Sequence, residues 1–317
     1  MMKVLLGNLV NVKTGKLDAN QADINGKYPF FTCSKEISKI NSYSYDCECV
    51  LIAGNGDLNV KYYNGKFEAY QRTYILTSID SNSLSNKYLY WFMNRYIVQL
   101  RNQSIGGVIK YIKLGDLTNI SLSLPTIDDQ RRIVRIFESI ERLISKKVFI
   151  LKALDDLIKS RFVEMFGDIR ERGRFKARKW KDVLDIFNGK DYKAVQVDKG
   201  GYPVYGSGGI IARANDYICP AGTIIIGRKG SINNPILVNE KFWNVDTAFG
   251  IVPKEIINIS YLYYFCKHYN FNYLNKATTL PSLTKRDLLE IEINIPDLEE
   301  QVKFSGYVNQ INKLKFA

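Results

Sequence analysis

GDLTNISLSLPTIDDQ, residues 115–130, and RDLLEIEINIPDLEEQ, residues 286–301, are the two stretches that decide the fold. Each contains a strand-like alternation of apolar and polar residues that stops at a proline, Pro125 or Pro296. Proline cannot continue the hydrogen-bond ladder of a central strand. Acidic residues and a glutamine follow the proline, as at the start of a helix. The chain is therefore predicted to contain the same strand-to-helix junction twice.

The similarity extends upstream from these junctions. GKYPFFTCS (26–34) matches GGYPVYGSG (200–208), and VLIAGNGDLN (50–59) matches IIIGRKGSIN (224–233), both at an offset of 174 residues. KYLYWF (87–92) matches SYLYYF (260–265) at 173, and the two junctions match at 171. Chance similarity would not hold its register over so many residues. An internal repeat of this kind predicts two copies of one structural unit.

The predicted fold class is α+β, with two tandem, similar domains of mixed α/β structure. Each copy has short β-rich runs bounded by Gly and Asn turns, an aromatic helix near residues 88–101 or 261–271, and a closing strand. The first domain is predicted to span residues 1–125 and the second residues 173–296.

A long helix is predicted over residues 126–172, between the two copies. No Pro or Gly occurs from residue 126 until Gly167, and Thr126 with Asp129 has the spacing of a capping box. Apolar residues recur at three- and four-residue steps, as in coiled coils. The residues expected to pack against a partner helix are Ile133, Phe137, Ile140, Ile144, Leu151, Leu154 and Ile158. About 40 residues at 1.5 Å each give a spacer of ~60 Å.

A shorter helix is expected in the second copy, over residues 297–317, where Gly306 weakens it. This distal helix is expected to cover at most half of the central one. The rest of the central apolar stripe is expected to bind another partner, and packing of the stripe on the chain's own domains is the alternative.

The chain carries a net charge of +13, and the excess lies in the two copies: residues 1–125 carry +5 and residues 173–296 carry +6. Such an excess favours an anionic partner, most often nucleic acid. Two similar basic domains on a spacer indicate a reader of two DNA half-sites. The candidate DNA-binding residues lie mostly in or near Gly-flanked loops and in the loops before the closing strands: Lys61, Lys66, Arg72, Arg101, Lys110, Lys113, Arg213, Arg228, Lys229, Lys241, Lys276, Thr278, Thr279 and Lys285.

The sequence offers no recognisable catalytic or metal-binding pattern. It has one His, no GxxxxGK[ST] loop and no glycine-rich cofactor loop after a strand. Its five Cys are scattered, and Cys47 and Cys49 have the wrong spacing for a zinc half-site. The chain is therefore predicted to be a binding protein, with no catalytic residue and no metal. Two alternatives stay open: a self-sufficient nuclease or methyltransferase with a diverged site, and an RNA-binding or coiled-coil scaffold.

Hydrophobic runs and cysteine usage indicate the cellular compartment of the protein. No run of ~18 apolar residues is present, and the N-terminal apolar stretch is too short for a secretory signal. An odd number of scattered cysteines fits a reducing compartment. We therefore expect a cytoplasmic protein that does not bind membranes.

The whole pattern resembles the DNA-specificity (S) subunit of type I restriction–modification enzymes. The resemblance is carried by the repeat, by LPTIDDQRRIVRIF with its echo IPDLEEQVKF, by the long helix ending in SRFVEMFGD, and by AGNGDLN and AGTIIIGRKGSIN. It implies that both domains, residues 1–125 and 173–296, are target-recognition domains, and that each reads one half of a split target in double-stranded DNA. The helices would set the spacing and dock two methyltransferase (M) subunits, which bring S-adenosylmethionine. Motor–nuclease (R) subunits, which use ATP and Mg²⁺, would complete the complex.

The resemblance also implies that the chain itself catalyses nothing and binds no cofactor. Members of this family typically end with a distal helix comparable to the central one, and here residues 297–317 are shorter. Self-association through the central helix is a further possible interaction.

Overall fold

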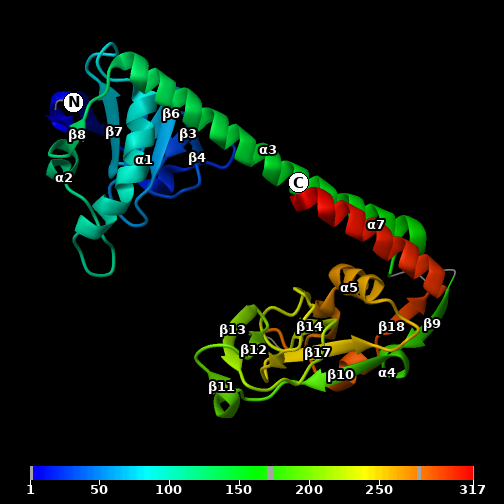
Figure 1. Ribbon diagram of the computed structural model, residues 1–317. Coiled ribbons are helices and arrows are strands. Elements are labelled where there is room, and N and C mark those ends of the chain that lie inside the picture. The colour runs from blue at the N-terminus through cyan, green and yellow to red at the C-terminus, as the bar shows by residue number, and fades with distance from the viewer. Residues whose placement is uncertain (1–2, 170–174, 277–279, 317) are drawn as a thin grey trace. The chain divides into compact units, whose positions relative to one another are not determined.

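The computed structural model describes residues 3–169, 175–276 and 280–316. Its contacts divide the chain into two compact units, Met1–Lys146 and Lys147–Ala317, which we call unit 1 and unit 2. The division falls inside one long helix, α3, which runs from Ile127 to Phe166 (Figure 1). The predicted α+β class, with two similar domains, a long central helix and a short distal one, is confirmed. The boundaries predicted at residues 125, 172 and 296 stay predictions.

Unit 1 is built on a sheet with the strand order β2-β7-β5-β6-β3-β4. Its other elements are one 3₁₀ turn on each side of β2, the helices α1 and α2, and a separate pair of β1 with β8. The elements are β1 (Lys3–Leu5), η1 (Leu6–Asn8), β2 (Val10–Thr14), η2 (Ala19–Gln21), β3 (Tyr28–Phe31), β4 (Ser38–Ile40), β5 (Tyr45–Ala53), β6 (Val60–Ala69), β7 (Thr73–Ser78), α1 (Asn86–Gln103), α2 (Leu114–Thr118) and β8 (Ser121–Ser123).

Unit 2 repeats this arrangement with the strands split over two sheets, β10-β17-β14-β15 and β11-β13-β12-β16. The elements are β9 (Lys176–Lys179), α4 (Trp180–Val183), β10 (Leu184–Asn188), η3 (Lys193–Val195), β11 (Gln196–Val197), β12 (Tyr202–Gly206), β13 (Gly209–Ala214), β14 (Thr223–Gly227), β15 (Ile236–Val238), β16 (Trp243–Asn244), β17 (Ala248–Pro253), α5 (Ile259–His268), η4 (Phe271–Leu274), α6 (Lys285–Leu289), β18 (Glu292–Ile295) and α7 (Leu298–Phe316).

The central strands β5 and β14 show why each unit folds as it does. Side chains alternate between the two faces of a strand. Val50 and Ile52 of β5 pack into the cluster formed with α1, while Leu51 packs into a second cluster with Phe31 and Phe67. In β14, Ile224 and Ile226 face the cluster that includes α5, and Ile225 faces a second cluster. Both strands are therefore buried on both faces, which explains their continuous apolar runs.

Other pairings are also duplicated. The short strand β3 runs parallel to β6, and β12 runs parallel to β16. Strand β1 pairs with β8, and β9 pairs with β18, so the first and last strands of each globular part are hydrogen-bonded to each other. The internal repeat seen in the sequence is therefore present in the topology.

The glutamine at each junction is completely buried and ties three segments together. In unit 1, the Gln130 side-chain nitrogen donates to the carbonyls of Ser83 and Pro125, at 2.8 and 3.0 Å, and its oxygen accepts from the Ser85 backbone N–H at 3.0 Å. Ser85 is the N-cap of α1. The glutamine therefore fixes the start of α3 to the start of α1.

Gln301 makes the same three bonds in unit 2. Its nitrogen donates to the carbonyls of Ile256 and Pro296, at 3.1 and 2.8 Å, and its oxygen accepts from Asn258 N–H at 2.7 Å. Asn258 is the N-cap of α5. The N-cap half of the predicted capping box is present at Thr126, whose hydroxyl oxygen accepts from the Asp129 N–H at 3.2 Å. The same hydroxyl donates to the Asp129 carboxylate at 2.8 Å.

The helix α3 is anchored at both ends. In unit 1, Phe137 stacks on Trp91 of α1 with ring centroids 4.8 Å apart. In unit 2, Ile158, Phe162 and Phe166 belong to the main core cluster. Residues 141–150 between these ends are all exposed, among them Leu143, which is 66% exposed.

The residues predicted to pack against a partner helix therefore lie in different environments. Ile158 is buried and Leu154 packs beside it in unit 2, whereas Ile140 and Ile144 are exposed. Phe137 contacts α1 of its own unit while remaining partly exposed, and Ile133 and Leu151 are half-buried.

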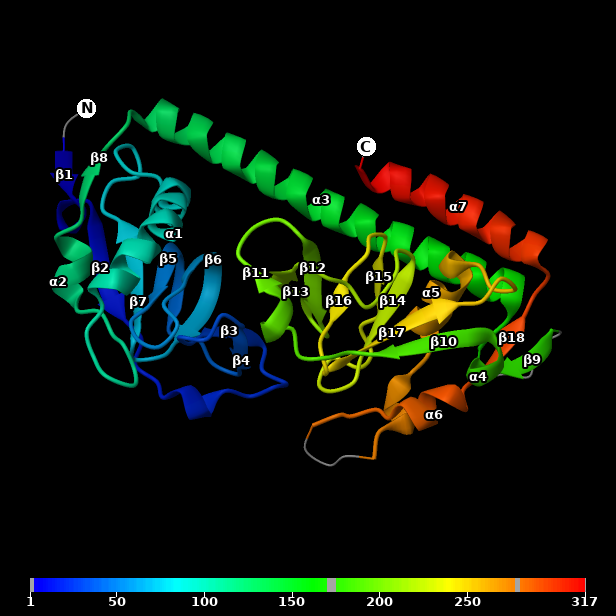
Figure 2. The same cartoon turned by 60° about the horizontal axis from the view of Figure 1, so that its bottom comes forward.

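The distal helix α7 lies along the second half of α3 (Figures 1 and 2). Phe304 contacts Phe162 edge-on at 5.5 Å, and Lys315 pairs with Asp155 at 2.6 Å. The helix passes through Gly306 without interruption, because Phe304, Val308 and Ile311 are buried on its inner face. The expected weakening at Gly306 is therefore offset by packing.

The second aromatic helix is shorter than predicted. Helix α5 ends at His268 instead of near Phe271. The Asn270 side chain accepts a hydrogen bond from the Asn272 N–H at 3.1 Å and caps the 3₁₀ turn η4. Such local side-chain bonds compete with helix continuation.

The single histidine, His268, packs against the end of α3. Its ring stacks on Phe162 with centroids 4.8 Å apart, and its Nδ1 lies 2.5 Å from the Tyr264 carbonyl oxygen. Among the described residues, its buried Nε2 has no hydrogen-bond partner. Burial lowers the pKa of His268 below its usual value. His268 is therefore a packing residue of unit 2.

Unit 2 is expected to lose stability as the pH falls from about 7 towards 5, because unfolded His268 with a pKa of about 6.5 takes up a proton before the folded residue does. A lowered histidine pKa contributes to the free energy of unfolding. This contribution is complete above the pKa of the unfolded state, and it is lost as the pH falls below that pKa. Urea unfolding of His268→Gln and of the unchanged protein at several pH values checks this. Parallel pH profiles for the two proteins would contradict the assignment.

Within residues 3–169, 175–276 and 280–316, no helix combines the length and the apolar character that crossing a bilayer requires.

Candidate nucleic-acid interface

A glycine-containing loop follows the central strand in each unit. We call residues 54–58 and 228–232 the glycine loops. Gly56 and Gly230 occupy equivalent positions and have φ values of +68° and +78°, which favour glycine. Leu58 and Ile232, two residues later, are buried and anchor each loop to its core. The duplicated glycine motif is thus a turn of the same geometry in both units.

Each glycine loop is hydrogen-bonded to a second loop that precedes α2 or α6. We call residues 104–111 of unit 1 the finger. The Gly56 N–H donates to the Lys110 carbonyl at 2.9 Å, and the Ile112 N–H donates to the Gly54 carbonyl at 2.9 Å. In unit 2, Gly230 N–H donates to Pro281 O at 3.0 Å, and Leu283 N–H donates to Arg228 O at 2.9 Å. Two segments that the sequence singled out separately therefore form one surface in each unit.

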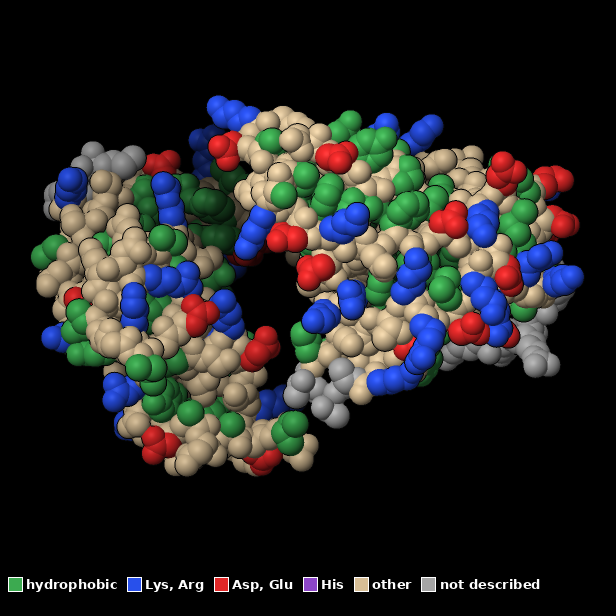
Figure 3. All heavy atoms as spheres, turned by 90° about the horizontal axis from the view of Figure 1, so that it is seen from below, with side chains coloured by type: hydrophobic (Ala, Val, Ile, Leu, Met, Phe, Trp, Pro, Cys, Tyr) green, Lys and Arg blue, Asp and Glu red, His purple; other side chains and the backbone are tan. Residues whose placement is uncertain are grey.

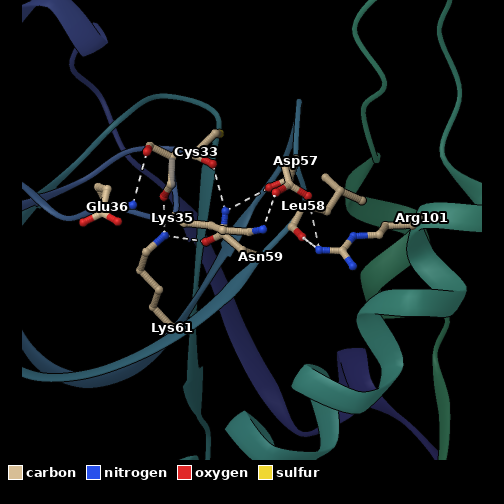
Figure 4. A network of polar contacts seen from close by, with 9 residues as sticks. Cys33, Lys35, Glu36, Asp57, Leu58, Asn59, Lys61 and Arg101 are labelled. Atoms are coloured by element: carbon tan, nitrogen blue, oxygen red, sulfur yellow. Dashed lines mark hydrogen bonds and ion pairs between the residues drawn. The ribbon is translucent and has the colours of Figure 1, made fainter. Parts of the chain in front are cut away.

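A polar network covers the glycine loop of unit 1 (Figure 4). Asp57 pairs with Lys35 at 2.9 Å and with Arg101 at 3.2 Å. The Lys35 ammonium is the main reason why the pKa of Asp57 lies below its usual value. Arg101 also donates to the Leu58 carbonyl at 2.5 Å. The Asp57 carboxylate and the Leu58 carbonyl of the glycine loop thus hold the Arg101 guanidinium against this loop.

Lys61 lies in the same network. Its ammonium donates to the Ser34 carbonyl at 2.6 Å and contacts the Asn59 side-chain oxygen. Asn59 in turn donates to the carbonyl of Cys33 at 2.8 Å. Partial burial lowers the pKa of Lys61. Lys61 therefore holds two loops together, and it reaches a ligand only if these bonds are exchanged.

Lys110 and Lys113 are exposed on and beside the finger, and Arg72 lines a hollow of about 290 Å³ with Gln71, Tyr74 and Ile112. Across the described residues, neither lysine has an ion pair. In unit 2, Arg228 and Lys229 are exposed on the glycine loop.

Other candidates of unit 2 are engaged within the chain. Lys276 pairs with Asp287 at 3.1 Å, and Lys285 donates to the Ile186 carbonyl at 2.7 Å. Thr278 and Thr279 lie outside the described residues.

A third group of candidates does not join the loop pairs. Lys66 lies 4.7 Å from the ring centre of Tyr43, and Lys241 lies 4.5 Å from that of Tyr217. The tyrosine contact raises the pKa of each lysine. These two lysines occupy equivalent positions of the repeat, as the third residues of NGKF (64–67) and NEKF (239–242). Arg213 of β13 donates to the Gly201 carbonyl at 3.2 Å.

Positive charge is dispersed over the one face that Figure 3 shows. On the face that Figure 3 shows, Lys and Arg side chains lie among acidic and hydrophobic side chains on each unit. Among its described residues, this face therefore carries no uniform basic patch. No cluster of three or more His, Cys, Asp or Glu side chains able to hold a metal ion occurs within the part of the chain that the structure describes.

Comparison with known proteins gives the class of this chain. The family model described as the type I restriction modification DNA specificity domain matches residues 1–153 and residues 173–315. The chain therefore belongs to this family, whose members supply the sequence specificity of type I restriction–modification systems. The resemblance read from the sequence, and the DNA-specificity role that it implies, are confirmed.

Particular relatives are specificity subunits. The specificity subunit of the type I restriction enzyme EcoDI from Escherichia coli is 46% identical to this chain over 130 residues. This match spans 41% of this chain and 29% of that protein. The MjaVIII specificity subunit of Methanocaldococcus jannaschii is 23% identical, covering 98% of this chain and 86% of the relative. The crystal structure of the type I S subunit from M. genitalium has a TM-score of 0.70 at 16% identity, over 99% and 90% of the two chains. That likeness supports the fold.

Proposed function

We propose that unit 1 and unit 2 each read one half of a bipartite sequence in double-stranded DNA. The observation that carries this proposal is the loop pair, which is repeated with the same two hydrogen bonds in both units. Backbone phosphates would be contacted by the exposed cations of these loops, and base edges by the loop tips. Two copies of one reading surface fit a target with two halves.

We also propose that the exposed apolar stretch of α3, including Leu143, Ile144 and Val148, binds methyltransferase subunits. These M subunits would bring S-adenosylmethionine, and motor–nuclease (R) subunits would bring ATP and Mg²⁺. The chain itself would select the site and catalyse nothing, in the cytoplasm. Self-association through the same stretch of α3 is the alternative use of this surface.

Exchange of residues 1–125 for the equivalent part of another specificity subunit is expected to change one half of the methylated sequence and leave the other half unchanged, because each unit has its own core and its own loop pair. The measurement is genome-wide mapping of methylated sites in cells that carry the methyltransferase partner. The matched exchange of residues 173–296 should change the other half. If either exchange alters both halves, the two-module proposal is wrong.

A further inference from the structure

The finger of unit 1 presents aliphatic side chains to the outside. Val108 is fully exposed, Ile109 is 62% exposed, and Ile105 and Tyr111 of the same loop are also exposed. Single apolar residues on a surface need no explanation, but four exposed apolar residues within residues 105–111 form a local group. In Figure 2 the segment between α1 and α2 extends away from the sheet of unit 1.

The finger is held in one conformation at its base. Ile105 and Tyr111 exchange two backbone hydrogen bonds, at 3.1 and 2.8 Å, and Lys110 accepts from the glycine loop. Gly106 has a φ of +117°, and a Cβ on it would lie 2.5 Å from the Ile109 carbonyl oxygen. The turn thus requires glycine and directs the next residues outward. Val108 and Ile109 are exposed because the backbone holds them there.

Unit 2 repeats the exposed aliphatic residue. Leu280 is 54% exposed and directly precedes Pro281, whose carbonyl accepts from Gly230. In the same way, Ile109 directly precedes Lys110, whose carbonyl accepts from the Gly56 N–H. A chance surface residue would not be expected at the same step of the same loop pair in both copies.

The surroundings of the finger indicate what it contacts. Lys110 and Lys113 follow the apolar tip in the chain, are exposed, and form no ion pair with any other described residue. The core of a protein–protein interface is depleted of charged residues, whereas a DNA groove is bordered by phosphates. The floor of the major groove also offers one apolar group, the 5-methyl of thymine. The two lysines match the phosphates that border the groove, and the aliphatic side chains of the tip match the thymine methyl group at its floor.

Resting on the proposed function, we propose that Val108 and Ile109 enter the major groove of the half-site read by unit 1 and contact a thymine methyl group. Leu280 is the counterpart in unit 2. The lysines beside the finger position it on the phosphates, and the aliphatic tip distinguishes thymine from cytosine by van der Waals contact.

The test uses the chain assembled with its methyltransferase subunits and a duplex that carries the mapped target. Each thymine is replaced in turn by deoxyuridine, which lacks only the 5-methyl group. We expect about three- to tenfold weaker binding when one particular thymine is replaced, as burial of a single methyl group predicts. The double variant Val108→Ala/Ile109→Ala is expected to bind the unmodified target as weakly and to lose no further affinity with deoxyuridine. Ile24→Ala, at an 88% exposed position of unit 1, should keep both the affinity and its dependence on the methyl group.

Several results would overturn the inference while leaving the proposed function intact: a wild-type complex that ignores every replacement, a double variant that keeps the deoxyuridine penalty, or a double variant that fails to bind methyltransferase in the absence of DNA. The last result would assign the tip to a protein contact. A wild-type complex without any sequence preference would overturn the proposed function and this inference with it.

Discussion

Replacing Phe162 by alanine is expected to lower the free energy of unfolding of unit 2 by about 3–5 kcal/mol. Phe162 is completely buried although it lies on the long helix that connects the two units. Its ring contacts those of Phe166, Tyr261, His268 and Phe304, at centroid distances between 4.8 and 5.5 Å. Truncation would leave a cavity at the point where α3, α5 and α7 meet.

The measurement is hydrogen exchange of the β14 amides, which report on unit 2 alone. Phe316→Ala provides the matched control, because Phe316 is 92% exposed on α7 and its loss should change the stability by less than about 0.5 kcal/mol. Equal effects of the two variants would show that the second half of α3 is not part of the core of unit 2.

Gln301→Leu is expected to destabilise unit 2 by about 2–5 kcal/mol, and Gln130→Leu to destabilise unit 1 by a similar amount, because each change leaves buried backbone groups without partners. The groups involved are two carbonyls and the N–H of a helix N-cap in each unit. Each variant should accelerate hydrogen exchange in its own unit, in α5 or in α1.

Gln310→Leu is the control for this pair, since Gln310 is an exposed residue of the same helix as Gln301. If Gln130→Leu loosened α5 as much as α1, the two junctions would not be independent. If either variant behaved like the control, the buried amide would be dispensable.

The sequence revealed the junction glutamines as a pattern but not their role. Two of the three hydrogen-bond partners of each glutamine lie about 45 residues earlier, at Ser83 and Ser85 or at Ile256 and Asn258. Spacing along the chain carries no information about such pairs. The repeat itself was predictable because both copies keep a continuous apolar run in β5 and β14, a glycine turn at Gly56 and Gly230, and a nearly constant offset along the chain.

The candidate site was predicted in outline. Charge pointed to the glycine loops and to the segments before the closing strands, and the structure joins these segments in both units. Arg101 and Lys61 could not be recognised as internally bonded, because Asp57 and Ser34 approach them only in the folded chain. Val108 and Ile109 were not among the predicted DNA-binding residues, because a prediction based on positive charge omits apolar side chains. The signal was an aliphatic pair directly after two glycines.

The pairing of β1 with β8, and of β9 with β18, has a consequence for how new specificities arise. The chain enters and leaves each globular part through two strands that lie side by side, Lys3–Leu5 with Ser121–Ser123 and Lys176–Lys179 with Glu292–Ile295. The glutamine that fixes the following helix lies just beyond the exit strand. Each globular part is therefore a cassette with adjacent ends, and genetic recombination at both ends of one part can replace it while preserving the helical frame.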